Sequence, residues 1–182
     1  NRSLAAYWCR QAAEQGHAAS LDCMGTLHEA GTGVPRDEAA AAAWYARAAA
    51  QGHVEAYVHL GRLHELGRGV PRDSGRAASL YREAAERGSL EGMLRLGLAY
   101  WHGEGLPMDR AEAYPWLEMA RFHSEQTADM RLRRHARRAL DALRAEMSAA
   151  ELDEGRQRLK GWVAARRAVR QPVAGGSLPT AR

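Results

Sequence analysis

Apolar and small residues recur three and four positions apart along most of the chain, which is the spacing of one face of an α-helix. The first clear stripe is formed by Leu21, Met24, Gly25 and His28, and it predicts a helix over residues 18–30. Gly25 leaves room on this stripe for a neighbouring helix to approach closely. We call this predicted element helix A.

A second helix is predicted directly after a short loop of sequence AGTGVPRD. Glycine tolerates the positive φ that often ends a helix, and proline cannot continue one. Asp37 then offers a carboxylate to the unpaired N–H groups of the next helix, over about 38–51. We call this element helix B, and the short loop makes helices A and B antiparallel neighbours.

The helix A, loop and helix B pattern recurs with a period of 36 residues. Four sets of glycines keep this period, as do three prolines and three aspartates: Gly16, Gly52 and Gly88; Gly25, Gly61 and Gly97; Gly31, Gly67 and Gly103; Gly33, Gly69 and Gly105; Pro35, Pro71 and Pro107; Asp37, Asp73 and Asp109. The period predicts a solenoid at 1–124, with a half-repeat at 1–16 and full repeats at 17–52, 53–88 and 89–124.

Composition supports an all-α fold. The 182 residues include 37 alanines, no isoleucine, seven valines and four threonines. Strands draw on β-branched residues, and so few of them cannot furnish a sheet of ordinary size. Alanine instead suits close contacts between helices.

The glycine pattern ends at residue 124, and a different unit is predicted at 125–170. An apolar stripe predicts a helix over about 127–147, and the capping-box pair Ser148 and Glu151 predicts another over 149–170. We expect these two helices to form a hairpin that covers the last exposed apolar surface of the solenoid. Residues 171–182 lack a periodic apolar face and are expected to be a flexible tail.

The repeated segment LGRLHELGRGVPRD, followed by AASLYREAAERG, resembles the Sel-one-like repeat, a relative of the tetratricopeptide repeat. The resemblance covers residues 1–124 and implies a right-handed α-α superhelix. It also implies a noncatalytic scaffold or adaptor that binds another protein or peptide, as a monomer or as part of a hetero-complex. An alternative is a periplasmic or secreted member acting in envelope assembly, host interaction or toxin neutralisation.

Side chains that vary between repeats while the scaffold stays constant are the candidate partner-binding residues. They lie on the face of helix A that is opposite the core stripe. In related solenoids the first helices line the concave surface. The candidates are Asp22, Thr26, Glu29, Glu55, His59, Arg62, Glu65, Glu91, Leu94, Arg95, Leu98 and Trp101. Leu94, Leu98 and Trp101 form an apolar stripe, which is either covered by the C-terminal hairpin, as we favour, or an exposed anchor for a partner.

Neither catalytic nor metal-binding residues stand out. The sequence contains no cluster of a nucleophile, a base and an orienting group. We therefore expect no enzyme activity and no cofactor. His28 and His64 are equivalent in successive repeats, too far apart for both to ligate one zinc ion. We expect both rings to face inward and to be hydrogen-bonded.

Cys9 and Cys23 lie seven residues either side of Gly16, so an antiparallel hairpin could bring them together. A secreted, cysteine-rich branch of the family joins its helices by disulfides, but with closer spacing and in every repeat. We therefore favour two free thiols over a disulfide. The compartment stays open, since a targeting segment could have been removed before Asn1.

The net charge of +4 is unevenly divided, with −3 over residues 1–120 and +6 over 121–170. The basic excess centres on Arg131, Arg133, Arg134, Arg137, Arg138 and Arg144. These arginines could dock on nucleic acid or an anionic membrane. No aromatic residues interleave with them to stack on bases, so we favour a solvated or acid-paired face and expect neither partner.

Overall fold

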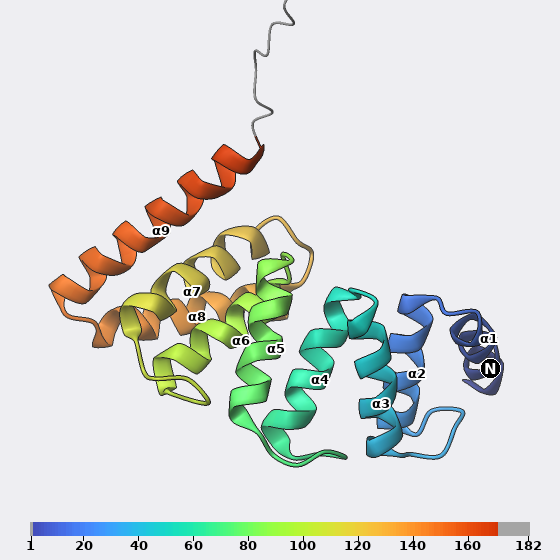
Figure 1. Ribbon diagram of the computed structural model, residues 1–182. Helices are drawn as coiled ribbons and strands as arrows, with labels where there is room; N and C mark the ends of the chain where they lie inside the picture. The colour runs from blue at the N-terminus through green and yellow to red at the C-terminus, as the bar shows by residue number, and fades with distance from the viewer. Residues whose placement is uncertain (1, 171–182) are drawn as a thin grey trace, which may run out of the picture.

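The computed structural model describes residues 2–170, and every regular element in that range is an α-helix (Figure 1). The helices are α1 (Arg2–Glu14), α2 (Ala18–Ala30), α3 (Glu38–Ala50), α4 (Val54–Leu66), α5 (Ser74–Glu86), α6 (Leu90–His102), α7 (Arg110–Ser124), α8 (Met130–Glu146) and α9 (Ala149–Arg170). The predicted all-α fold is confirmed. Helices A of the three repeats are α2, α4 and α6, and helices B are α3, α5 and α7. The predicted tail at 171–182 lies outside the described residues.

Each helix B begins at the aspartate that the sequence marks as its cap. Asp37, Asp73 and Asp109 each accept a hydrogen bond from the backbone N–H three residues on, at 2.8–2.9 Å. This contact satisfies one of the N–H groups that the first turn of a helix leaves without a partner. The cap explains why all three helices B begin at the same point of the repeat.

Within a repeat, helices A and B pack through a glycine set against a large side chain. A Cβ atom at Gly25 would lie 2.4 Å from the ring of Tyr45, and one at Gly61 would lie 2.6 Å from the ring of Tyr81. Both rings are buried. Any side chain at these glycines would displace the ring and separate the two helices.

Successive repeats contact each other partly through backbone atoms alone. Gly69, with φ of 69°, lies so near the start of α3 that a Cβ atom would be 2.2 Å from the carbonyl oxygen of Glu38. Gly105, with φ of 76°, makes the same approach to Ser74 at the start of α5. Only glycine combines this φ with this proximity. Each loop is thereby set against the helix B of the preceding repeat.

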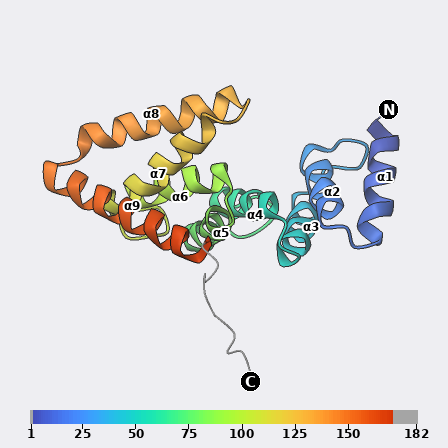
Figure 2. The same cartoon turned by 90° about the horizontal axis from the view of Figure 1, so that it is seen from above.

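The repeats stack into a right-handed superhelix with the two kinds of helix on different sides. Figure 2 shows α2, α4 and α6 along one side of the array, with α3 and α5 along the other. Helices α2 and α4 therefore present neighbouring surfaces. No helix in the described range has the length and apolar character required to cross a bilayer.

The two C-terminal helices both pack on α7 rather than closely on each other. Figure 2 shows α8 and α9 diverging on either side of α7, so the expected hairpin is an open V. Helix α8 covers the apolar stripe of α6, as favoured from the sequence. Leu94 is fully buried, and the indole N–H of Trp101 donates a 2.9 Å hydrogen bond to Glu146.

Candidate protein-binding face

The variable side chains of α2 and α4 meet in pairs across the boundary between two repeats. Asp22, which is nearly buried, lies with Oδ1 2.8 Å from Nδ1 of His59. Its second oxygen lies 3.7 Å from Nε2 of His53, which is also 3.6 Å from the exposed carboxylate of Glu55. One buried carboxylate on α2 therefore faces two histidines that the next repeat supplies.

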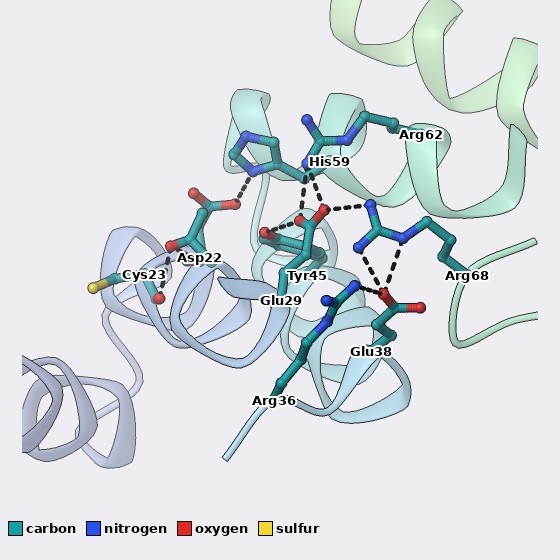
Figure 3. A network of polar contacts seen from close by, with 10 residues as sticks. Asp22, Cys23, Glu29, Arg36, Glu38, Tyr45, His59, Arg62 and Arg68 are labelled. Atoms are coloured by element: carbon teal, nitrogen blue, oxygen red, sulfur yellow. Dashed lines mark hydrogen bonds and ion pairs between the residues drawn. The ribbon is translucent and has the colours of Figure 1, made fainter. Parts of the chain in front are cut away.

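Glu29 is the centre of a larger network at the C-terminal end of α2 (Figure 3). Its carboxylate accepts hydrogen bonds from Arg62 at 2.9 Å, from Arg68 at 3.3 Å and from the Tyr45 hydroxyl at 3.0 Å. Burial, assisted by the charge of Glu29, raises the pKa of Tyr45. Tyr45 thus stays protonated and acts as a fixed donor that orients the carboxylate.

Glu38, the first residue of α3, extends this network. It accepts hydrogen bonds from Arg68 and Arg36, each at 2.6 Å, and these contacts lower its pKa. Three arginines therefore surround two carboxylates, which leaves one positive charge in excess. An open groove of about 460 Å³ lies among Thr26, Glu29, Ala30, Arg36, Arg62 and Arg68.

The next boundary repeats the arrangement with a different arginine. Glu65, equivalent to Glu29, accepts hydrogen bonds from the Tyr81 hydroxyl at 2.5 Å and from Arg95 at 3.2 Å. Arg95 also donates to Glu91 at 2.8 Å. Arg95 precedes by three residues the position equivalent to Arg62, which is Leu98. The carboxylate and tyrosine are thus common to both boundaries, whereas the arginine differs.

The structure divides the remaining predicted residues into exposed and covered ones. Thr26 is exposed, and its hydroxyl donates to backbone carbonyls of its own helix. Leu98 is half-buried, and Leu94 and Trp101 lie beneath α8 and offer no surface to a partner. The apolar stripe of the third repeat is therefore covered, as favoured from the sequence, while Glu91 and Arg95 of the same helix remain partly exposed.

Sequence reasoning restricted to helix A missed four members of the network. Arg36 and Arg68 come from the loops, and Glu38 and Tyr45 come from helix B. Arg68 was accessible to the same reasoning, because its equivalents are Thr32 and Glu104 and the position varies between repeats. Variable loop positions are therefore as informative as variable helix positions.

Comparison with known families decides the identity of this array. A model of the Sel1 repeat matches residues 1–17, 24–53, 54–89 and 90–121, more than half of the chain. The chain belongs to the Sel1 repeat family. No curated protein matches it.

Two solved structures share this Sel1 fold. A Sel1 repeat protein from Oxalobacter formigenes is 33% identical with a TM-score of 0.63, over 68% of this chain and 51% of that one. A protective antigen present in uropathogenic Escherichia coli strains is 26% identical with a TM-score of 0.78, over 100% of this chain and 38% of that one. The Sel1 array described here spans about half or less of the length of either protein.

The two cysteines of this Sel1 array form a disulfide. Cys9 of α1 and Cys23 of α2 are bonded, with their Cα atoms 6.2 Å apart. The expectation of two free thiols is therefore wrong. The hairpin centred on Gly16 brings the equidistant cysteines together, so the wider spacing that argued against a bond is no obstacle.

Histidine positions of the Sel1 repeats also differ from expectation in one respect. His28 and His64 are half-buried, but the buried Nδ1 atom of each has no hydrogen-bond partner in the part of the chain that the structure describes. The prediction of satisfied inward-facing rings is therefore wrong at Nδ1. Within residues 2–170, no group of three His, Cys, Asp or Glu side chains is arranged to hold a metal ion.

The arginines of α8 divide between internal contacts and solvent. Arg144 pairs with Glu118 at 2.8 Å, and Arg133 donates to the backbone carbonyls of Glu125 and Thr127. Arg131 and Arg138 are exposed. Part of the basic excess therefore fastens α8 to α7 and to the loop between them.

Proposed function

We propose that this Sel1 array is a noncatalytic scaffold that holds an acidic segment of a partner protein on the groove between α2 and α4. Sel1 repeat proteins are generally protein-interaction scaffolds, and the family assignment supports a protein as the partner. The arginines that line the groove indicate that the bound segment is acidic. Its candidate residues pair with one another in a structural network rather than around a reactive group.

The observation that carries this proposal is the excess of guanidinium groups over carboxylates around the groove. Among the described residues, the three arginines Arg36, Arg62 and Arg68 form ion pairs only with Glu29 and Glu38, and Arg36 remains mostly exposed. The Nε atom of Arg62 is buried and has no hydrogen-bond partner within residues 2–170. A carboxylate entering the groove would gain charge-assisted hydrogen bonds and neutralise the surplus.

The buried part of the network holds these arginines in place before a partner arrives. Tyr45 fixes Glu29, and Glu29 in turn fixes Arg62 and Arg68. Side chains that are already ordered lose little entropy on binding, and this preorganisation favours affinity. Glu29 and Tyr45 are therefore positioning residues, and the arginines make the contact.

The test is quantitative affinity capture with the full chain as bait. The double variant Arg62→Gln/Arg68→Gln removes two donors, and Arg131→Gln/Arg138→Gln removes two equally charged but distant arginines of α8. We expect the groove variant alone to lose the captured partner by about tenfold or more. Equal losses from both variants would refute the proposal, provided that both melt as the native chain does.

The disulfide favours one of the alternative settings for this scaffold. Disulfides persist in oxidising compartments and are rare in the cytosol. The Cys9–Cys23 bond therefore supports a periplasmic or secreted Sel1 protein that binds its partner outside the cytoplasm. Fractionation of the source cells, with an alkylation assay of the two cysteines in each fraction, tests this setting.

A further inference from the structure

A second groove lies between α7 and α9, which pack on each other at the C-terminal end of the array. Its volume is about 470 Å³, and its lining includes Glu118, Met119, Phe122, Trp162, Val163 and Arg166. Most of this lining is apolar. Phe122 and Val163, from opposite walls, are 53% and 40% exposed. The volume falls within the range typical of ligand pockets.

The charges at the rim of this groove are unequally neutralised. Glu118 is paired with Arg121 at 2.5 Å and with Arg144 at 2.8 Å. Arg166 lies over the ring of Trp162 and donates one hydrogen bond, to the backbone carbonyl of Glu86. No carboxylate in the described part of the chain lies within ion-pair distance of Arg166. The charge that remains at the rim is therefore positive.

We propose that this groove is a second docking site, which binds an amphipathic helix of a partner protein through apolar side chains and a carboxylate. Two helical walls with mainly apolar lining form a setting in which a third helix commonly binds. Phe122 and Val163 would contact its apolar anchors. Arg166 retains N–H donors for the carboxylate, because a guanidinium carries five.

Charge complementarity selects this occupant over two others. The segment 171–182, QPVAGGSLPTAR, contains an arginine and no acidic side chain, so none of its side chains would pair with Arg166. A second copy meeting the groove face to face would bring one Arg166 against the other, which is unfavourable. An acidic helix of another protein meets neither objection.

The probes are two labelled model peptides of roughly 16 residues, long enough to form helix. Both carry leucines at i, i+4 and i+7, and their polar faces carry glutamates in one and lysines in the other. Binding to the full chain is measured by fluorescence polarisation. The variants are Arg166→Glu, Phe122→Ala/Val163→Ser and, as a matched charge control on α8, Arg131→Glu.

We expect the glutamate peptide to bind about tenfold or more tightly than the lysine peptide, and Arg166→Glu to reverse that preference. Phe122→Ala/Val163→Ser should weaken both peptides, whereas Arg131→Glu should weaken neither. Because the groove between α2 and α4 also attracts carboxylates, binding is measured in the Arg62→Gln/Arg68→Gln background as well. The losses caused by Arg166→Glu and by Phe122→Ala/Val163→Ser should persist there, which separates the two sites.

Three results would overturn the proposal. The first is no binding of either peptide, and the second is an equal effect of Arg166→Glu and Arg131→Glu. The third is sedimentation of the native chain as a dimer that Phe122→Ala/Val163→Ser converts to a monomer, because a second copy would then occupy the groove.

Discussion

The disulfide between Cys9 and Cys23 occupies the place that the rings of Tyr45 and His59 occupy one repeat later. Each residue of the second pair follows its counterpart by 36 positions, and the two ring centroids lie 4.8 Å apart. One repeat further on, Arg95 lies over the ring of Tyr81. Three different chemistries thus join a helix B to the following helix A at one position of the repeat.

Loss of the disulfide should loosen α1 selectively. Cys9→Ser removes a cross-link between residues 14 positions apart, and closing a loop of that size contributes about 3 kcal/mol. Because repeats contact only their neighbours, the effect should stay at the N-terminal end. Hydrogen exchange should show faster exchange in α1 and unchanged protection in α4 and α5. Unchanged protection in α1 would contradict the assignment.

Substitution of a packing glycine should separate helices A and B. A Cβ atom at Gly61 would overlap the buried ring of Tyr81, so Gly61→Ala should destabilise the array by about 1–3 kcal/mol. Gly161 in α9 provides the matched control, because nothing lies within 4 Å of its Cβ position. Gly161→Ala should raise helix stability by about 0.5–1 kcal/mol. Denaturant unfolding followed by circular dichroism measures both, and a loss from Gly161→Ala equal to that from Gly61→Ala would contradict the packing argument.

Trp101 should contribute to stability and not to partner binding. Trp101→Ala leaves a cavity beneath α8 and should cost about 3–5 kcal/mol. Trp101→Phe retains an aromatic ring but loses the hydrogen bond to Glu146, at a cost of about 1 kcal/mol. Partner affinity should be unchanged in the folded Trp101→Phe protein. A large loss of affinity without loss of stability would show that the indole is accessible.

The contact of α9 with α7 should depend on pH through Asp109. Partial burial opposes ionisation of Asp109, but hydrogen bonds from Arg158 and from the backbone N–H of Glu112 outweigh it and lower its pKa. A carboxylate with a lowered folded-state pKa stabilises the protein above its unfolded-state value and loses this effect as pH falls through the folded-state value.

Arg158→Gln should therefore cost about 1 kcal/mol or less at neutral pH, since the pair is partly solvent-screened. The difference from the native chain should shrink as pH falls through the lowered folded-state pKa of Asp109. Urea unfolding over a series of pH values from neutral to acid measures it. A difference that does not depend on pH would mean that Arg158 acts through packing alone.

The repeat architecture could be predicted closely because its signals are local. The helix predicted at 18–30 matches α2, since glycine and aspartate mark its surroundings directly. The helix predicted from about 127 begins only at Met130. Asp129 caps it by accepting hydrogen bonds from two backbone N–H groups, so the preceding residues are excluded.

The pairing of the candidate site residues could not be predicted, because it depends on the reach of side chains across repeats. Glu29 meets Arg62, 33 residues later, whereas Glu65 meets Arg95, only 30 residues later. Both arginines are long enough to reach the same carboxylate position from different turns of a helix. Periodicity identifies which residues vary, and geometry alone decides which of them contact each other.

The backbone contacts at Gly69 and Gly105 join successive repeats in the same way, whatever side chains each repeat carries on helix A. Because the approach to the preceding helix B involves no side chain at these glycines, this spacing between repeats is independent of the residues displayed on helix A. A repeat could thus be duplicated, or its helix A residues replaced, with these backbone contacts retained. The helix A residues of one 36-residue repeat can therefore be exchanged to build a new binding surface.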